Sequence, residues 1–470
     1  MTDTATSLLD AVTVPEAEGR AIPDAATREI IGYAPNHTVD DLEAAIAAAR
    51  AAQPAWNALG HAERSRLLNL VADEIEANAD ELALILSREQ GKPLDGPNAR
   101  FEVGACAVWT RNAADTVLEP EVVFEAGESR AEIHYDALGV VGAIGPWNWP
   151  MMISVWQIAP SLRMGNTVIV KPSGFTPLSV LALVEIFNRH LPADVLTVIT
   201  GERGVASRLA AHPDIDKIMF TGSTPTGRRI VESSANNLAR LTLELGGNDA
   251  GIVLPGTDVK AHAENLFWGA FINGGQTCAA LKRLYVHDSV YDATVEALGE
   301  IARTIPFGRG TDAGNVIGPL QNEGQFDIVK RLVDEAAAAG GRVVVGGAPA
   351  PELGPLFFQP TIVADVSDGV ALVDEEQFGP ALPITRYTDV EDAIRRANDS
   401  EEGLGASVWS DDRAAAVEVA KRLEAGTVWI NSHGGLNPQV PFGGTKSSGY
   451  GQEFGVAGLK GVAAPKVISY

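Results

Sequence analysis

Two residues in glycine-rich segments have the chemistry for a covalent reaction. Cys278 ends the segment Phe271-Ile-Asn-Gly-Gly-Gln-Thr-Cys278, and it lies 34 residues after Glu244, which begins Glu244-Leu-Gly-Gly-Asn248. Glycines let another molecule approach the backbone closely. A thiol nucleophile and a carboxylate that activates water together indicate covalent acyl chemistry. The alternative for Cys278 is a buried thiol that packs as a small hydrophobic side chain.

The second cysteine, Cys106, lies in the apolar segment 101–109, and we expect it to be part of the core. Two cysteines cannot form a disulfide framework. The sequence has no Cys-x-x-Cys and no His-Glu-x-x-His motif, so we expect no metal site.

Length and composition describe a folded protein of two or three domains. The chain has 470 residues, of which 46% are hydrophobic and 21% are charged, and its formal net charge is −25. This acidic excess disfavours nucleic acid and anionic membranes as partners. The N-terminus has no basic run before an apolar stretch, and no apolar segment is long enough to span a bilayer. We expect a cytoplasmic protein.

The elements that must position these residues alternate along the chain. Residues 1–35 are rich in Ala, Pro and acidic residues, and we expect an irregular lead-in. Helical periodicity begins near Asp40 and continues over 62–89 and 98–116. Short apolar runs then predict buried strands at 140–144, 167–170, 196–199 and 217–220, with helices at 151–163 and 177–189 between them. This alternation predicts βαβ units and a parallel sheet.

A second alternating region follows. Its predicted strands are 250–253, 283–286, 343–345, 383–387, 406–409 and 428–430, and its predicted helices are 258–271, 289–304, 321–339 and 413–423. The segment 122–138 has alternating polar residues that predict a two-stranded excursion, and 464–470 is a further predicted strand. The fold class is therefore α/β, with two α/β domains and an extension.

Eight motifs occur in an order that resembles the aldehyde dehydrogenase superfamily, from about residue 20 to the C-terminus. They are Gly145-Pro-Trp-Asn-Trp-Pro150, Lys171-Pro-Ser173, Phe220-Thr-Gly-Ser223, Glu244-Leu-Gly-Gly-Asn248, Gly275-Gln-Thr-Cys278, Glu375-Glu-Gln-Phe-Gly-Pro380, Pro441-Phe-Gly-Gly444 and Lys446-Ser-Ser-Gly449. Each alone is a weak signal, whereas the ordered set is highly specific.

The resemblance implies three structural parts and one reaction. The parts are a Rossmann-like NAD(P)-binding domain (1–119 and 139–246), an α/β catalytic domain (247–449) and a small β oligomerisation extension (120–138 and 450–470). The reaction is the oxidation of an aldehyde to its carboxylic acid with NAD or NADP as cofactor.

The resemblance also gives the catalytic residues their roles. Cys278 attacks the aldehyde to form a thiohemiacetal and then a thioester. Asn148 donates a hydrogen bond to the oxyanion, with the Cys278 N–H as the second donor. Glu244 activates the water that releases the acid. From the residues alone, Asn148 could instead cap the helix that begins at Pro150, and Glu244 could be a solvated surface charge.

The cofactor site is expected over several segments. The segment 220–227 follows a predicted strand and begins a helix, and backbone amides at a helix start attract phosphate, although its glycines alone are a weak signal because a turn before a helix commonly has them. By resemblance, Ser223 contacts the pyrophosphate, Lys171 the adenosine ribose, Glu376 the nicotinamide ribose and Phe378 the nicotinamide ring. The full set that we expect to bind the cofactor is Ile144, Pro146, Trp147, Lys171, Ser173, Gly174, Gly222, Ser223, Gly227, Leu245, Gly246, Glu376 and Phe378.

Two departures from the family pattern affect the expected chemistry. Gly174 stands where NAD-preferring relatives commonly have an acid, so a 2′-phosphate meets no repulsion and NADP should be tolerated. Gln157 stands after Trp156, where many relatives have a lysine that relays protons with a late glutamate, here Glu453. Because a neutral amide does not exchange protons in that way, we assign no relay to Glu453.

By analogy with the family, the aldehyde approaches along Trp149, Met152, Trp156 and Phe442. These large apolar residues suit an uncharged aliphatic or aromatic aldehyde, although they could also be core residues. No arginine lies in the helix that begins at Pro150 before Arg163, so no clamp for a semialdehyde's acid group is evident. The extension predicts a homodimer or homotetramer.

Three other functions are compatible with parts of the sequence. A cofactor-independent thiol esterase would need a Cys–His pair, but His262 and His287 lie in no recognisable motif. A CoA-acylating semialdehyde dehydrogenase would use CoA in place of water, whereas Glu244 favours water. A non-catalytic protein with the same fold has no need of Cys278, Asn148 and Glu244 together.

Overall fold

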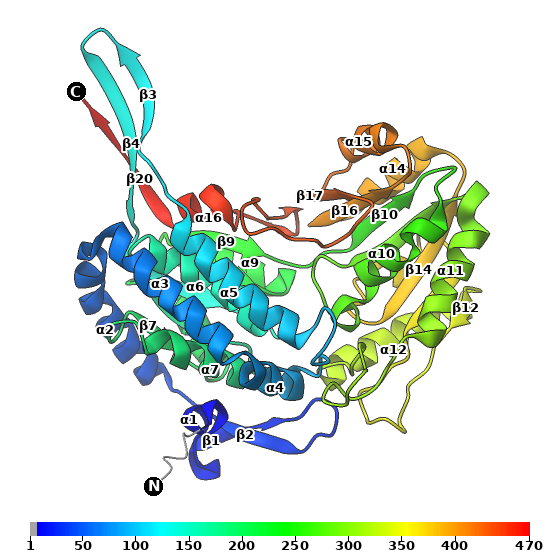
Figure 1. Ribbon diagram of the computed structural model, residues 1–470, viewed down its shortest axis with the longest axis horizontal. Coiled ribbons are helices and arrows are strands. Elements are labelled where there is room, and N and C mark those ends of the chain that lie inside the picture. Colours follow the sequence, from blue (N-terminus) through cyan, green and yellow to red (C-terminus); the bar gives the residue numbers. More distant parts are fainter. Residues whose placement is uncertain (1–6) are drawn as a thin grey trace.

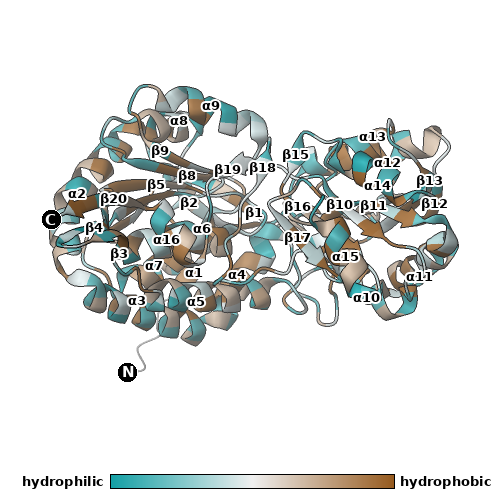
Figure 2. Cartoon of the chain, turned by 90° about the horizontal axis from the view of Figure 1, so that it is seen from above, coloured by the Kyte–Doolittle hydropathy of each residue, from teal (hydrophilic) through white to brown (hydrophobic). Residues whose placement is uncertain are grey.

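The computed structural model describes residues 7–470, which form two lobes side by side, a projecting arm and an N-terminal hairpin (Figure 1). In the view from above, hydrophobic strands lie inside both lobes, under helices whose outer surfaces are hydrophilic (Figure 2). No helix within residues 7–470 has both the length and the apolar character needed to cross a membrane.

The first lobe is built on a six-stranded sheet with the order β19-β9-β8-β5-β6-β7. All strands are parallel except β19, which pairs antiparallel with β9. Their bounds are β5 Val140–Ile144, β6 Thr167–Lys171, β7 Leu196–Val198, β8 Lys217–Thr221, β9 Arg240–Glu244 and β19 Gly449–Tyr450.

Helices cover both faces of this sheet, which is why its central strand β5 is apolar throughout. Along β5, Val141 and Ala143 belong to the core under one layer of helices, whereas Val140 and Ile144 belong to the core under the other. The first layer contains α3 Gly60–Ala77, α4 Ala79–Gln90, α5 Ala99–Asp115, α6 Pro150–Arg163 and α7 Pro177–Asn188, and the second contains α2 Val39–Ala58, α8 Arg203–Ala211 and α9 Thr224–Ser234.

The second lobe is built on a seven-stranded sheet with the order β12-β13-β14-β11-β10-β16-β17, in which only β12 is antiparallel to its neighbour. The strands are β10 Asp249–Val253, β11 Leu281–His287, β12 Arg342–Val345, β13 Thr361–Val366, β14 Ala381–Tyr387, β16 Gly405–Trp409 and β17 Thr427–Ile430. The helices of this lobe are α10 Val259–Phe271, α11 Tyr291–Thr304, α12 Glu323–Ala338, α13 Ala371–Asp374, α14 Val390–Asn398 and α15 Arg413–Ala420.

The arm is a three-stranded antiparallel sheet with the order β20-β4-β3 (Figure 1). It joins β3 Glu121–Ala126 and β4 Ser129–Ala137 to the C-terminal strand β20 Ala463–Ser469, which follows α16 Gly455–Gly461. The predicted two-stranded excursion and the predicted tail strand therefore lie in one sheet.

The expectation of an irregular lead-in over residues 1–35 is wrong for most of that range. The chain forms α1 Leu8–Val12 and the hairpin of β1 Gly19–Pro23 and β2 Ile30–Pro35, while residues 1–6 lie outside the described part. The hairpin packs its apolar side chains under the first lobe, and Ile22 and Ala34 are fully buried there. The hairpin has regular structure because its apolar side chains are buried against the first lobe, and composition does not reveal such a contact.

Three further differences concern element boundaries. The predicted single helix over 62–89 is two helices, α3 and α4, because Asn78 leaves the helical conformation and its side-chain amide caps the Glu74 carbonyl. Strands β9 and β13 and helices α8 and α14 were not expected. The bounds of the three proposed domains stay a prediction, and β19 shows that residues 449–450 complete the sheet of the first lobe.

Cys106 is fully buried in α5, which confirms its place in the core.

Small elements connect the larger ones: the 3₁₀ turns η1 Glu16–Glu18, η2 Ile272–Gly275 and η3 Asp288–Val290, and the two-residue strands β15 Glu402–Gly403 and β18 Thr445–Lys446, which pair with each other.

Candidate active site

The loop that carries Cys278 makes a left-handed turn directly after α10. Asn273, Gly274 and Gly275 have positive φ angles of 51°, 61° and 74°. Position 275 needs glycine for a second reason, because a Cβ atom there would overlap the backbone carbonyl of Gly379. The turn therefore brings the chain against Gly379, just before β14. The residues that follow the turn lead to Cys278.

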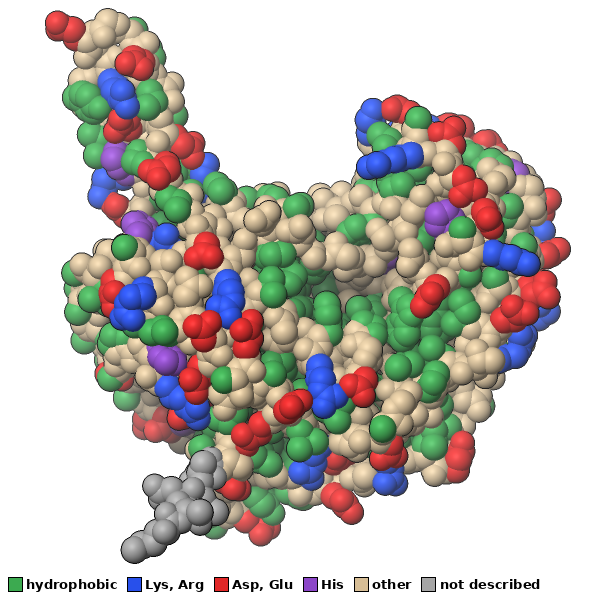
Figure 3. Space-filling model, viewed as in Figure 1, with side chains coloured by type: hydrophobic (Ala, Val, Ile, Leu, Met, Phe, Trp, Pro, Cys, Tyr) green, Lys and Arg blue, Asp and Glu red, His purple; other side chains and the backbone are tan. Residues whose placement is uncertain are grey.

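Cys278 lies where two cavities meet. One cavity, of about 550 Å³, lies against the first lobe, and the other, of about 520 Å³, is mainly apolar; Cys278 lines both. The space-filling view shows the hollow between the lobes with hydrophobic side chains around it (Figure 3). Such volumes are typical of small-molecule sites. A reaction at this thiol can thus combine two ligands that enter from different sides.

The thiol is set in a mixed electrostatic environment. Burial raises the pKa of Cys278 to about 12, Lys282 acts in the opposite direction, and the nearby carboxylates Glu244, Asp249 and Glu376 raise it further. Since the thiolate is the nucleophile, the resting thiol needs activation before it attacks a carbonyl.

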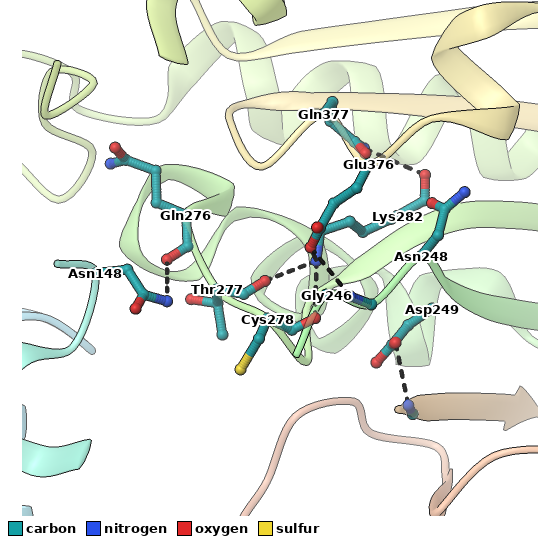
Figure 4. Close-up of polar contacts among 12 residues, drawn as sticks. Asn148, Gly246, Asn248, Asp249, Gln276, Thr277, Cys278, Lys282, Glu376 and Gln377 are labelled. Atoms are coloured by element: carbon teal, nitrogen blue, oxygen red, sulfur yellow. Dashed lines mark hydrogen bonds and ion pairs between the residues drawn. The ribbon is translucent and has the colours of Figure 1, made fainter. Parts of the chain in front are cut away.

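Asn148 is fixed beside the nucleophile loop. Its Nδ2 donates to the Gln276 carbonyl at 3.0 Å (Figure 4). Its own backbone carbonyl accepts from Lys92 Nζ at 2.8 Å and from Asn273 Nδ2 at 2.9 Å. Its side chain does not cap α6. That role falls to Glu102, whose Oε1 accepts from the amides of Met151 and Met152 at 2.9 and 3.1 Å.

The Cys278 N–H is available as a second donor, since within residues 7–470 it donates no hydrogen bond. The Asn148 amide contacts the same loop at Gln276, so it and this N–H are the two candidate donors to an oxyanion that forms on attack by the thiol.

Glu244 ends β9 opposite Gly449 of β19, and the two glycines after it bring its segment to the thiol loop. A Cβ atom at Gly247 would stand 2.8 Å from the Cys278 carbonyl oxygen. The Glu244 carboxylate is buried, and neither of its oxygens has a hydrogen-bond partner within residues 7–470. Burial, and then the charge of Glu453, raise its pKa well above the usual value, which makes it a stronger base than a surface glutamate.

Glu453 forms the second half of a buried carboxyl pair. Burial raises the pKa of Glu453 to about 8, and Lys217 opposes the shift. Lys217 lies on β8 and donates to Thr242 Oγ1 at 2.8 Å. Gln157 is also buried and donates only weakly to Thr221, at 3.3 Å. A lysine therefore faces Glu453 from the sheet, although position 157 on α6 has none.

The first cavity is lined by most of the residues that we expected to bind a cofactor. Expected lining residues are Pro146, Trp147, Gly222, Ser223, Leu245, Gly246, Glu376 and Phe378; Thr224, Pro225, Thr226, Gln325, Ile328 and Glu402 were not expected. The amides at the start of α9 face this cavity, where a helix terminus attracts phosphate groups. Phe378 lies edge-on to Trp147 with a ring-centre distance of 5.3 Å. This lining fits a dinucleotide with its pyrophosphate at α9.

Five expected cofactor residues lie outside the lining: Ile144, Lys171, Ser173, Gly174 and Gly227. Gly227 packs against Leu245, where a Cβ atom would stand 2.6 Å from Leu245 Cδ2. Lys171 and Gly174 lie at the end of β6, beside Arg20 of the N-terminal hairpin.

Arg20 gives the end of β6 a positive charge that the sequence did not indicate. A Cβ atom at Gly174 would stand 3.6 Å from Arg20 Nη2. Within residues 7–470, the Arg20 guanidinium forms no ion pair, and its charge helps to lower the pKa of Lys171 to about 8, after burial as the larger cause. Two cations, neither of which forms an ion pair within residues 7–470, thus lie near the position of Gly174.

The apolar cavity contains three of the four residues expected along the aldehyde's path. Trp149, Met152 and Trp156 line it, but Phe442 does not: it is buried and stacks on Phe454 at a ring-centre distance of 6.0 Å. Lining residues that the sequence analysis missed include Phe101, Trp109, Trp268, His433 and Leu436. Apart from Leu436 these residues are aromatic, and that was the only available signal, because they come from distant segments.

The described lining of this cavity contains no Arg or Lys. Its one histidine, His433, is committed elsewhere: Nδ1 lies 2.9 Å from Ser407 Oγ and Nε2 lies 3.2 Å from Asp249 Oδ2. The cavity therefore offers no free cation to a negatively charged ligand.

The comparisons with known proteins agree with this fold and site. The model of the aldehyde dehydrogenase family matches residues 15–468. The chain is 38% identical to a phenylacetaldehyde dehydrogenase of Pseudomonas fluorescens (93% of this chain, 89% of the relative) and 37% identical to the succinate-semialdehyde dehydrogenase [NADP(+)] of Escherichia coli K12 (93% and 92%). The crystal structure of an E. coli NADP-dependent enzyme superposes with a TM-score of 0.94 at 36% identity, covering 98% of this chain and 96% of that one.

A two-lobed α/β fold with a thiol between a dinucleotide-type cavity and an apolar cavity defines an oxidoreductase. The chain belongs to the aldehyde dehydrogenase family, and it is an NAD(P)-dependent aldehyde dehydrogenase.

Proposed function

We propose that the protein oxidises an uncharged aliphatic or aromatic aldehyde to its carboxylic acid through a thioester on Cys278, which water cleaves. The observation that carries this proposal is the place of Cys278 at the junction of the two cavities, next to the Asn148 amide and its own unpartnered N–H.

Cys278 and the two donors perform the first half of the reaction. The Cys278 sulfur bonds to the aldehyde carbon, and the carbonyl oxygen becomes an oxyanion that accepts hydrogen bonds from the Asn148 amide and the Cys278 N–H. In other acyl-transfer sites, loss of one such donor costs about 3–4 kcal/mol of barrier. When bound, NAD(P)⁺ supplies the acceptor for the hydride that leaves this carbon, so that a thioester remains on Cys278.

Glu244 performs the second half. Its carboxylate takes a proton from a water molecule, the hydroxide oxygen bonds to the thioester carbon, and the carbon–sulfur bond breaks to give the acid and the Cys278 thiolate. The raised pKa of Glu244 supports this role, because a buried carboxylate with a high pKa is a good proton acceptor near neutral pH.

The lining of the apolar cavity supports the substrate class. Trp109, Trp149 and Trp156 offer aromatic surface. The described lining has no Arg or Lys that could pair with a carboxylate carried by the aldehyde. The relative named for phenylacetaldehyde fits this interpretation, whereas succinate semialdehyde, the substrate in the other relative's name, has a carboxylate that no cation of this described lining would pair with. A panel of aldehydes in which succinic semialdehyde has the highest kcat/KM would contradict it.

NAD or NADP is the proposed cofactor, with NADP used at least as well as NAD. Gly174 places no acid against a 2′-phosphate, and Arg20 and Lys171 provide two cations near that position. The related NADP-dependent enzymes are compatible with this preference.

Glu244 distinguishes this reaction from the alternatives. A CoA-acylating enzyme needs no water-activating base, and a thiol esterase would release acid without reducing a dinucleotide. Following absorbance at 340 nm with an aldehyde, with and without CoA and with each dinucleotide, separates the three.

The central test uses two variants. Cys278→Ala should form no reduced dinucleotide. Glu244→Gln should retain a burst of one reduced dinucleotide per active site, followed by slow turnover, because hydride transfer precedes the water step. Loss of the burst in Glu244→Gln would mean that this residue acts earlier than proposed.

We also propose a homodimer or homotetramer in the cytoplasm. The arm has two unpaired sheet edges, and both cysteines of the chain are free thiols, as a reducing compartment permits.

A further inference from the structure

A buried lysine that the proposed reaction does not use lies under the nucleophile loop. Lys282, the second residue of β11, has a side chain that is only 1% exposed. Its Nζ donates to the carbonyls of Thr277 at 2.7 Å and Cys278 at 2.8 Å, and it lies 3.1 Å from Glu376 Oε1 (Figure 4). An ammonium group has three N–H donors, so these three acceptors satisfy it completely.

This placement brings a full positive charge to the backbone of the nucleophile itself. A buried cation is costly unless an anion compensates it, and the only ion-pair partner of Lys282 within residues 7–470 is Glu376. The two carbonyls that it holds are neutral. The electrostatic potential at Cys278 therefore depends on how strongly Glu376 engages Lys282.

Glu376 has a second task in the proposed function. Its side chain is 25% exposed and lines the dinucleotide cavity, where we propose that it binds the nicotinamide ribose. Its Oε1 already accepts from Lys282 and from the Gly247 amide at 3.3 Å. Ribose hydroxyls that donate to this carboxylate draw on the same negative charge, and they weaken its hold on Lys282.

We propose that the Lys282–Glu376 ion pair couples ribose binding to the activation of Cys278: the Lys282 charge stabilises the thiolate, and the Glu376 charge opposes it until ribose hydroxyls engage the carboxylate. This proposal rests on the proposed function. Its consequence is an order of events, because the nucleophile becomes more reactive when the hydride acceptor is in place.

The other charged groups around Cys278 do not supply this coupling. Glu244 faces it from β9, and the charge that acts on Glu244 is that of Glu453. Asp249 faces it from β10, and its carboxylate is bonded to His433 and to the Gly405 amide at 3.1 Å. Lys282 is the one group that lowers the pKa of Cys278, and Glu376 is one of those that raise it.

The test measures the alkylation rate of Cys278, which needs no catalytic turnover. Neutral iodoacetamide is used so that the reagent's charge plays no part, and mass spectrometry confirms that Cys278 is the modified residue, with Cys278→Ala as the blank. Rates are taken from pH 6 to 9 in the wild type, Lys282→Met, Lys282→Arg and Glu376→Gln, each without cofactor and with saturating NADH or NADPH. Reduced cofactors are chosen because their nicotinamide ring is uncharged.

The two ion-pair variants should change the rate in opposite directions. A displacement of about one pH unit changes the thiolate fraction tenfold, but a more basic thiolate is also more nucleophilic, so the net change in rate is about threefold. We expect Lys282→Met to react about threefold more slowly than the wild type and Glu376→Gln about threefold faster. Lys282→Arg, which keeps the charge, should stay close to the wild type.

Reduced cofactor should accelerate alkylation of the wild type more than that of either Lys282→Met or Glu376→Gln. The bound nicotinamide ring shields the thiol equally in the wild type and in the two variants. Comparing the cofactor ratio, which is the alkylation rate with cofactor divided by the rate without it, therefore removes this effect. The proposal is overturned if both variants shift the rate in the same direction, if neither shifts it, or if the cofactor ratio is equal in all three proteins.

Failure of this proposal is distinguishable from failure of the proposed function. Aldehyde-dependent formation of reduced dinucleotide by the wild type tests the function alone. A wild type that oxidises aldehydes, with unchanged alkylation rates in the variants, retains the function and refutes the coupling.

Discussion

At the scale of single residues, the buried pair of Glu244 and Glu453 determines the pH range of the water step. Burial is the main cause that raises the pKa of both, and the Glu453 charge raises the pKa of Glu244 further, while Lys217 lowers that of Glu453. Glu244 must be ionised to accept a proton from water. The water step therefore accelerates as pH rises through the pKa of Glu244.

Glu453→Gln should move this acidic limb to lower pH. The substitution removes the repelling charge, so the pKa of Glu244 falls, and the ionised base is present at lower pH; we expect a displacement of about one unit. The measurement is the steady rate that follows the burst, recorded from pH 5 to 9. An acidic limb that is unchanged, or displaced to higher pH, would contradict this account.

Asn148→Ala should lower kcat by about 10²–10³, because it removes one oxyanion donor. Asn148 does not act on the thiol before an oxyanion exists, so iodoacetamide should still alkylate Cys278 at the wild-type rate. If both rates fall together, Asn148 shapes the loop through its contact with Gln276 and is not primarily an oxyanion donor.

At the scale of elements, the turn before Cys278 depends on glycine at one particular place. Gly275 has a positive φ and lies against the Gly379 carbonyl, so Gly275→Ala should displace the loop, lower the melting temperature and abolish the burst. Gly104 provides the matched control, since it is an exposed helical glycine of α5 with no atom near an added Cβ.

Gly104→Ala should keep full activity and stabilise the protein by about 0.5–1 kcal/mol, because alanine is the better helix former. Thermal unfolding and the 340 nm burst are measured on both variants. Equal activity of Gly275→Ala and Gly104→Ala would show that the turn is not required.

The N-terminal hairpin contributes a cation that no motif indicated. We expect Arg20→Ala to weaken the binding of NADP and of adenosine 2′,5′-bisphosphate by about tenfold or more, and that of NAD and 5′-AMP little, since a lost charged hydrogen bond is worth about 1.5–3 kcal/mol. Fluorescence titration gives the four dissociation constants. Equal losses for the 2′-phosphorylated and unphosphorylated ligands would exclude a contact with the 2′-phosphate.

Sequence patterns predicted the elements that are buried on both faces and the residues that stand in family motifs. Strand β5 and the Cys278, Asn148 and Glu244 segments are of this kind, because their signal is local. Arg20 and His433 could not be predicted, since each acts on a partner far away in sequence. Lys282 lies only four residues after Cys278, but its ion-pair partner Glu376 is distant in sequence and no motif indicated the pair. Phe442 shows the converse: its motif suggested the aldehyde's path, but its neighbour Phe454 holds it in the core.

At the scale of the whole molecule, the two lobes and the arm divide the tasks. One lobe supplies the start of α9, Asn148 and Glu244, and the other supplies Cys278, Lys282 and Glu376, so the site exists only where both meet (Figures 1 and 4). The arm contributes nothing to this site. Its edge strands carry exposed apolar residues instead: Val122, Val123 and Phe124 on β3, and Val467 and Ile468 on β20.

Exposed apolar residues on unpaired sheet edges are unfavourable in an isolated chain, which is why we propose that another subunit covers them. We therefore expect the wild type to have a mass in solution that is a multiple of the 49.4 kDa chain.

Val467 is 62% exposed on the arm, and Val467→Lys should lower the number of subunits by placing a charge in that contact. Leu238 is 86% exposed between α9 and β9, and Leu238→Lys should leave the mass unchanged. Light scattering after size-exclusion chromatography measures all three proteins. A monomeric wild type, or a mass that falls as much in Leu238→Lys as in Val467→Lys, would show that the arm does not hold the assembly together.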